Sequence, residues 1–293
     1  MLKELLLLKR QSITIAKVML FLLASAFSSI SAQAMQVAIL NMVGDEKGEF
    51  TQLLRTEARR NSPEISLIDE DQTAVALRGA GYSGSLNLSR DEARALGLSL
   101  GCDLFVIGKV LLARRIDSAD KFYFESFAAM FLIDTRSGRL LKFLFADSKA
   151  DQEKEARAQL IASLNAHWQV FKEVIKDANV SAQKVSESSQ SLTSQEEVID
   201  LDHAPSGLAA PVFYQRLKPP YNDQAKLAAI TATVELDVVF QADGRVGKVE
   251  IVRWAGFGLD ESAVATVRQL RFKPAELNGR KVSVRARVQY NFR

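Results

Sequence analysis

The chain has 293 residues, of which 47% are hydrophobic and 25% are charged. This balance is typical of globular proteins and excludes wholesale disorder, and the length allows two modest domains. The net charge of +3 arises entirely within residues 1–34, because the rest of the chain carries 34 basic and 34 acidic residues. The overall basic charge is therefore no argument for nucleic-acid binding, and we expect no nucleic acid among the partners.

Residues 1–34 have the features of an export signal. Basic side chains precede an apolar run at 18–27, and Ala32 and Ala34 fit an A-x-A cleavage site. The uninterrupted apolar stretch, 18–30, is shorter than the roughly 20 residues that a membrane-spanning helix needs. We predict a cleaved signal peptide; an uncleaved inner-membrane anchor is the alternative. In both cases we expect the rest of the chain in the periplasm of a Gram-negative-type envelope.

Strand and helix signals alternate between residue 35 and about residue 178. Apolar runs predict strands at 35–43, 65–71 and 103–115, and a hairpin at 135–138. Helical spacing predicts helices at 49–60, 73–79 and 89–97, the last with a Ser89–Glu92 capping box and a terminal Gly97. A long helix from about residue 151 has one apolar line: Ala156, Leu160, Leu164, Trp168, Phe171 and Ile175. The sequence predicts an α/β domain with a mixed sheet over 35–178.

Residues 179–210 are rich in Ser and Gln and have few large apolar side chains, so we predict a flexible linker. Cys102 is the one cysteine, which excludes an internal disulfide. It stands before an apolar run, where a free cysteine usually behaves as a small buried hydrophobe.

Residues 211–293 predict an α+β domain, an antiparallel sheet packed on a helix. Residues 232–240 alternate apolar and polar side chains, and Asp243-Gly244 is typical of a hairpin turn. The last strand alternates as well. Its predicted inward side chains are Val282, Val284, Ala286, Val288, Tyr290 and Phe292. Its predicted outward side chains are Ser283, Arg285, Arg287, Gln289 and Asn291.

The order of motifs in this domain resembles the C-terminal domain of the TonB family. They read "KPPYNDQAKLAAITATVELDVVF", "ADGRVGKVEIV", "GFGLDESAVATVRQLRFKPA" and "LNGRKVSVRARVQYNF". The residues that carry the resemblance are Pro220, Tyr221, Asp243, Gly244, Leu259, Asp260, Phe272, Pro274, Asn278 and Gly279. Ala229 and Ala232 stand where the family has glycines, which indicates a changed loop before the first strand. Residues 35–178 more faintly resemble the α/β domains of curli-assembly (CsgG-like) and TolB N-terminal-like envelope proteins.

Signals for catalysis are weak. The two histidines, His167 and His203, have no partner spacing that makes a zinc site. No nucleophile elbow, Walker loop or dinucleotide fingerprint appears, and the glycine-rich 79–85 does not open a helix after a strand. We therefore expect no enzyme, no cofactor and no metal.

Charge divides the chain unevenly. Residues 211–293 carry a net charge of +6 and residues 35–210 a net charge of −6. Arg285 and Arg287 lie on the outward face of the last strand, with Arg271 and Lys273 nearby in the sequence. Three interpretations stay open: an ordinary solvated face, a patch that steers an acidic partner or the envelope surface, or docking onto the acidic N-terminal half.

A terminal strand that alternates cleanly offers an edge to which a partner's extended segment can add. The same arginines can also protect such an edge from aggregation.

The resemblance implies an energy transducer that couples an inner-membrane motor complex to an outer-membrane receptor. The alternative is an exported scaffold or assembly module without energy coupling. The apolar N-terminal run lacks the family's Ser-x-x-x-His pattern, and a folded domain replaces its proline-rich spacer. A homodimer is a further partner hypothesis.

Overall fold

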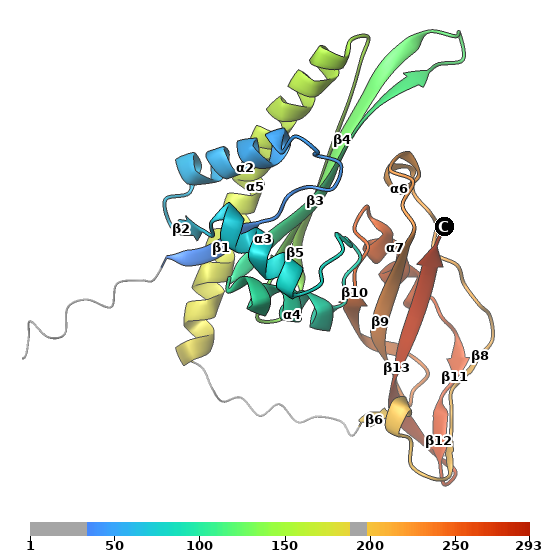
Figure 1. Cartoon of the computed structure of the whole chain (residues 1–293). Coiled ribbons are helices and arrows are strands. Elements are labelled where there is room, and N and C mark those ends of the chain that lie inside the picture. The colour runs from blue at the N-terminus through green and yellow to red at the C-terminus, as the bar shows by residue number, and fades with distance from the viewer. Residues whose placement is uncertain (1–33, 188–197) are drawn as a thin grey trace, which may run out of the picture. The chain divides into compact units, whose positions relative to one another are not determined.

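The computed structural model describes residues 34–187 and 198–293 (Figure 1). Residues 35–293 form one compact unit. The predicted signal or anchor, with Ala32, lies outside the described residues, and Ala34 is exposed at their start. No helix in these two stretches is long and apolar enough to cross a membrane.

The N-terminal half contains the predicted mixed sheet. Its strand order is β2-β1-β3-β4-β5. The strands are β1 Met35–Ile39, β2 Ile65–Leu67, β3 Leu104–Ile116, β4 Phe122–Asp134 and β5 Leu140–Ala150. Strands β2, β1 and β3 pair in parallel, whereas β3, β4 and β5 form antiparallel pairs.

Both faces of this sheet are buried, which explains the continuous apolar runs of its strands. Helices α2 (Glu49–Asn61) and α5 (Glu153–Glu187) cover one face (Figure 1). The predicted apolar line of α5, from Ala156 to Ile175, is buried there. Helices α3 (Glu70–Gly79) and α4 (Arg90–Leu100) contribute to the core on the other face. The Ser89–Glu92 capping box of α4 is confirmed.

The C-terminal half is the predicted α+β domain. Its sheet has the order β10-β9-β13-β12-β7, with helices α6 (Asp223–Leu227) and α7 (Leu259–Val267). The strands are β7 Leu208–Ala209, β9 Ala232–Phe240, β10 Val246–Arg253, β12 Ala275–Leu277 and β13 Arg280–Phe292. Strands β8 (Val212–Phe213) and β11 (Phe272–Lys273) form a separate pair. Every second residue of β9 is buried, as the alternation predicts.

The segment predicted as a linker, 179–210, is partly structured. Helix α5 continues to Glu187, and β6 (Val198–Asp200) pairs in parallel with β13 before the 3-10 turn η1 (Leu201–His203). Strand β7 pairs with β12. Ile199, Leu201 and Leu208 pack against the core. Three isolated apolar residues give no periodic signal, so composition alone did not reveal these short elements.

Candidate partner-binding site

Strand β13 is paired along one side and largely unpaired along the other. It pairs with β9 from Val284 to Phe292. On the opposite side, β6 pairs only with Ser283–Arg285. Within residues 34–187 and 198–293, no strand pairs with that opposite side from Ala286 to Phe292. We call this stretch the outer edge of β13.

The hydrogen bonds of β9 show which peptide groups face the outer edge. The Thr233 N–H donates to Asn87 Oδ1 over 3.0 Å, and the Gln241 N–H donates to the Arg245 carbonyl over 2.9 Å. Odd-numbered residues of β9 therefore direct their peptide groups away from β13. In an antiparallel ladder, two paired residues direct their peptide groups either both toward each other or both away from each other. The partners of these residues on β13 therefore direct their peptide groups away from β9. Hence Arg287, Gln289 and Asn291, which pair with Asp237, Glu235 and Thr233, direct their N–H and C=O groups toward the outer edge.

Four of the five predicted outward side chains are exposed: Arg285, Arg287, Gln289 and Asn291. Ser283 differs from the prediction, because it is buried and its Oγ accepts the Ala242 N–H over 3.1 Å. It lies where β6 covers β13, so its side chain is not available to a partner.

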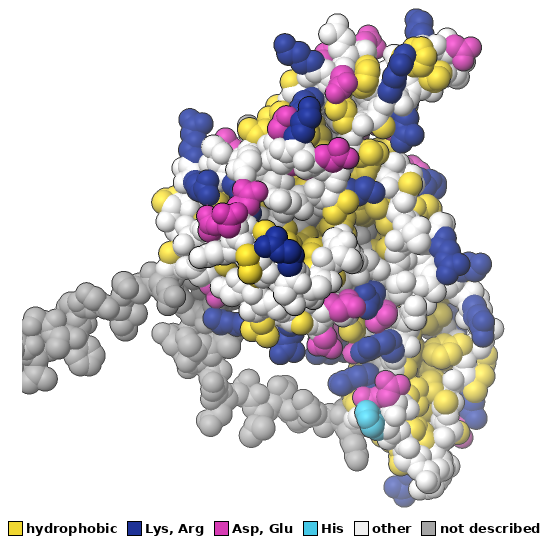
Figure 2. Space-filling view, in the orientation of Figure 1, with side chains coloured by type: hydrophobic (Ala, Val, Ile, Leu, Met, Phe, Trp, Pro, Cys, Tyr) yellow, Lys and Arg dark blue, Asp and Glu magenta, His cyan; other side chains and the backbone are white. Residues whose placement is uncertain are grey.

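Acidic residues pair with two of the four basic residues of the predicted basic face, Arg287 and Lys273. Arg287 donates to both carboxylate oxygens of Asp237, at 2.9 and 3.3 Å, and these hydrogen bonds raise the pKa of Arg287. Lys273 pairs with Glu276 at 3.0 Å. Figure 2 shows basic and acidic side chains interspersed over the face in view. Among the described residues Arg285 has no ion pair, and it lies directly before the outer edge.

The family-motif residues build the domain. Asp243-Gly244 and Asn278-Gly279 form the two hairpin turns, with positive φ at Gly244, Asn278 and Gly279. The Tyr221 hydroxyl lies 2.7 Å from the Ile230 carbonyl, and the Pro220 carbonyl accepts the Ser262 hydroxyl over 2.9 Å. Leu259 and Phe272 are buried in the core. The ring of Pro274 lies 3.9 Å from where a Cβ on Gly244 would stand.

Asp260 holds the loop before α7. Its carboxylate accepts the N–H groups of Ala255 and Gly256, each over 2.8 Å. Burial raises the pKa of Asp260 to about 7, although these two hydrogen bonds act in the opposite direction. The carboxylate therefore fixes residues 255–258 rather than facing a partner.

That loop carries Phe257, which joins the two halves of the compact unit. Phe257 is 1% exposed, and its ring centroid lies 4.9 Å from that of Phe143 and 5.7 Å from that of Phe145. A Cβ on Gly256 would lie 2.6 Å from the Phe131 ring, so this approach requires glycine. Residues of both halves thus form one hydrophobic core.

Polar contacts accompany this core. The Asn87 amide donates to the Thr233 carbonyl over 2.8 Å. Arg253 donates to Glu92 over 2.9 Å and to Glu235 over 3.3 Å. Burial lowers the pKa of Arg253, but these two carboxylates outweigh burial and raise it. Sequence reasoning missed both residues, since nothing in an isolated Asn or Arg indicates a distant partner.

In residues 34–187 and 198–293, no three His, Cys, Asp or Glu side chains are grouped to hold a metal ion. His167 Nδ1 lies 2.6 Å from the Ser163 carbonyl of its own helix, and His203 is exposed in η1. Cys102 is buried, and burial raises the pKa of its thiol to about 11, which keeps it protonated.

Comparisons with known proteins agree with the motif reading of the C-terminal half. The family model for the Gram-negative bacterial TonB protein C-terminal matches residues 218–293. No curated protein matches the chain. The resemblance of residues 35–178 to curli-assembly and TolB N-terminal-like domains stays a prediction.

Three solved structures show distant likeness. Lipoprotein GNA1162 from Neisseria meningitidis is 13% identical over 46% of this chain and 99% of its own, with a TM-score of 0.33. The TonB C-terminal domain of Pseudomonas aeruginosa is 19% identical over 32% and 91%, with a TM-score of 0.26. The LpoB C-terminal domain of Escherichia coli is 14% identical over 45% and 93%, with a TM-score of 0.27.

The family assignment rests on the match over residues 218–293. The strand order, the two hairpin turns and the helix after "GFG" stand in the order that the family motifs predict. Residues 218–293 therefore match the TonB C-terminal domain family.

Proposed function

We propose that this periplasmic protein captures an extended segment of another envelope protein by adding it as a strand to the outer edge of β13. The observation that carries the proposal is the set of main-chain groups on Arg287, Gln289 and Asn291. They face an edge that no strand occupies in the described part of the chain. Strand addition to such an edge is a common mode of peptide recognition. The role is binding, and we propose no catalysis, cofactor or metal for it.

The energetics favour reversible capture. Each of the three residues offers one N–H and one C=O group. At about 1 kcal/mol net for each hydrogen bond, the main chain contributes about 6 kcal/mol. Association costs roughly 4–15 kcal/mol, so backbone pairing alone gives weak binding. Side-chain contacts must supply the remainder, and the unpaired Arg285 at the end of the edge favours a partner segment with an acidic residue there.

Strand β6 supports the proposal from within the chain. Val198–Asp200 pairs with Ser283–Arg285 on the side of β13 opposite β9. This side therefore already accepts an added strand. A partner segment that pairs with Arg287–Asn291 has to end near Arg285 or displace β6.

Two functions are compatible with such capture. In the first, the protein couples inner-membrane energy to an outer-membrane receptor, as the TonB resemblance implies. In the second, it is a periplasmic scaffold or assembly module without energy coupling. The core around Phe257 favours the second, since it fixes the TonB-like domain to a folded α/β half instead of leaving it on a spacer.

Site-specific photo-crosslinking in cells tests the capture. A photoreactive residue in place of Gln289 is expected to give adducts with one or a few envelope proteins on illumination. The matched control replaces Leu98, which is 72% exposed on α4, and is expected to give no such adduct. An outer-membrane receptor in the adduct favours energy transduction, a periplasmic or assembly protein favours the scaffold, and a second copy indicates a homodimer. Equal adducts from both positions would contradict the proposal.

A further inference from the structure

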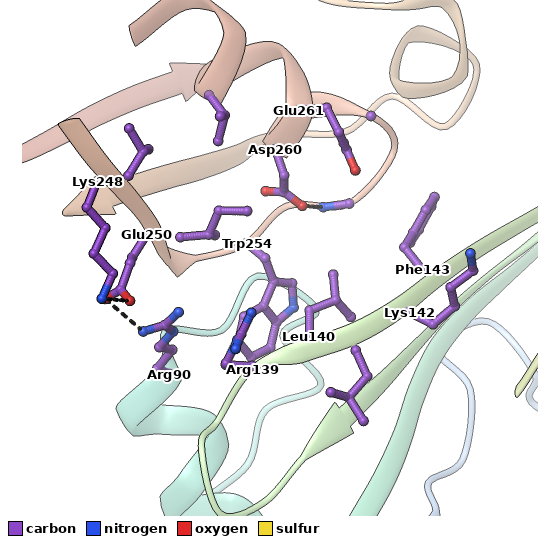
Figure 3. Close-up of a pocket in the computed structure, with 16 residues that line it drawn as sticks. Arg90, Arg139, Leu140, Lys142, Phe143, Lys248, Glu250, Trp254, Asp260 and Glu261 are labelled. Atoms are coloured by element: carbon purple, nitrogen blue, oxygen red, sulfur yellow. Dashed lines mark hydrogen bonds and ion pairs between the residues drawn. The ribbon is translucent and has the colours of Figure 1, made fainter. Parts of the chain in front are cut away.

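Two hollows of the TonB-like half differ in charge. The first lies at the junction of the two halves, where Glu250 pairs with Lys248 at 2.7 Å and with Arg90 at 3.7 Å (Figure 3). Asp260 and Glu261 also line it, so acids and cations are mixed there. The second is a groove of about 990 Å³, and no Asp, Glu or Lys of the described residues lines it.

Three segments of the TonB-like half form this second hollow, which we call the arginine groove. The lining residues are Tyr214, Gln215 and Leu217 after β8, 244–246 at the turn between β9 and β10, and 268–271 at the end of α7. The Tyr214 N–H donates to the Arg271 carbonyl over 3.1 Å, and the Arg268 N–H donates to the Val264 carbonyl over 3.2 Å. Backbone hydrogen bonds thus tie the first segment to the third and the third to α7.

The charged residues of the groove are three arginines. Arg268 and Arg271 have no ion pair and no side-chain hydrogen bond within the described part of the chain. Arg245 lies 3.7 Å from Asp243, but both side chains are exposed, and such a pair contributes only about 0–1 kcal/mol. Arg271, predicted as part of the basic face, lines this groove. Charge complementarity therefore favours an acidic occupant.

The uncharged side chains of the groove suit a protein segment. Tyr214 is 71% exposed, and Val212 and Phe213 before it are exposed as well. Tyrosine and arginine are enriched at protein interfaces, whereas Lys, Glu and Asp are depleted. The amides of Gln215 and Gln269 have no side-chain hydrogen bond in the described residues, and each offers both donors and an acceptor. A peptide backbone uses both kinds of group, whereas a phosphate needs donors alone.

We propose that the arginine groove is a second protein-binding surface, which takes an extended acidic segment of another envelope protein. Carboxylates of the segment pair with Arg268 and Arg271, because the guanidinium fork matches carboxylate geometry. An apolar side chain of the segment packs on the Tyr214 ring. No described residue of β13 lines this groove, so the proposal does not depend on strand capture at the outer edge.

Fluorescence anisotropy of a labelled synthetic peptide tests this proposal with the purified protein. In the probe, Glu alternates with Leu and Ser, and the reference peptide has Lys in place of every Glu. We expect saturable binding of the Glu probe that weakens as the salt concentration rises, and no binding of the Lys peptide. Absence of saturable binding of the Glu probe, or equal binding of the two peptides, overturns the proposal.

Matched variants locate the probe on the protein. Arg268→Gln and Arg271→Gln are each expected to weaken binding by about tenfold, which corresponds to about 1.4 kcal/mol, and Tyr214→Ala by a similar factor. Arg280→Gln and Phe122→Ala remove an exposed arginine and an exposed aromatic ring that do not line the groove, and are expected to leave binding unchanged. Equal losses in the groove and control variants overturn the proposal.

Two further measurements address other occupants. Flotation with phosphatidylglycerol vesicles tests a membrane surface, and analytical ultracentrifugation tests a second copy of the chain. We expect neither vesicle binding nor self-association to change in Arg268→Gln or Arg271→Gln. Vesicle binding or a dimer that these two variants lose, while Arg280→Gln retains it, would assign the groove to that occupant and overturn the proposal.

Discussion

Gln289→Pro is expected to weaken partner capture and leave the protein folded, whereas Val288→Pro is expected to unfold the TonB-like domain. The two positions are neighbours but face opposite sides of β13. The Gln289 N–H is directed to the outer edge, where no ladder bond within the described chain is lost. The Val288 N–H is directed to β9, in the middle of the sheet, where proline is not tolerated.

The expected magnitude follows from a single hydrogen bond. A partner carbonyl left without its donor costs about 1–3 kcal/mol, and about 1.4 kcal/mol is a tenfold change in affinity. The affinity of Gln289→Pro for the partner is therefore expected to fall about five- to 150-fold. The measurement is the amount of crosslinked partner that immobilised protein retains, with the melting temperature of each variant as the folding control. Full capture by a folded Gln289→Pro protein would show that the partner binds elsewhere.

Phe257→Ala is expected to be among the most destabilising single substitutions in the chain. Its ring contacts Phe131, Phe143 and Phe145 across the junction of the two halves. Truncation of a buried phenylalanine costs about 3–5 kcal/mol. At about 2–4 °C for each kcal/mol in a unit of this size, we expect a fall in melting temperature of about 6–20 °C by calorimetry.

Phe122→Ala is the matched control for this change. Phe122 is 51% exposed at the start of β4, where its ring lies against the Arg114 guanidinium at 3.6 Å. An exposed contact of this kind contributes about 0.5–1 kcal/mol, so its loss is expected to shift the melting temperature by only a few degrees. If Phe257→Ala melts no lower than Phe122→Ala, the rings around Phe257 do not hold the two halves together.

Much of the fold follows from local patterns. The alternation of β9 and β13, the Asp243-Gly244 and Asn278-Gly279 turns, and the Ser89 capping box each depend on residues close together in the sequence, and each is confirmed. The alternation identified the side chains of Arg287, Gln289 and Asn291 as outward. Which peptide groups face the outer edge follows instead from the hydrogen bonds of β9 and its register with β13.

The features that the sequence did not predict depend on contacts between distant segments. Gly97 looks like the end of a helix, but α4 continues to Leu100, and a Cβ on Gly97 would lie 2.3 Å from Thr135 Oγ1. Asn87 has no periodic or motif signal, and the motif that contains Phe257 does not indicate its contacts, because the partners of both residues lie in the other half of the compact unit. Strand β6 consists of three residues whose pairing is set by the edge of β13. Ser283 is buried where its Oγ accepts the Ala242 N–H from the turn between β9 and β10.

Hydrogen exchange along β13 tests the central claim most directly. In the free protein, the amides of Arg287 and Gln289 are expected to exchange at least about tenfold faster than those of Val288 and Tyr290, since only the latter bond to β9. Addition of the partner identified by crosslinking is expected to slow exchange at Arg287, Gln289 and Asn291. Uniform protection in the free protein, or unchanged exchange at these three amides when the partner is bound, would contradict capture by strand addition.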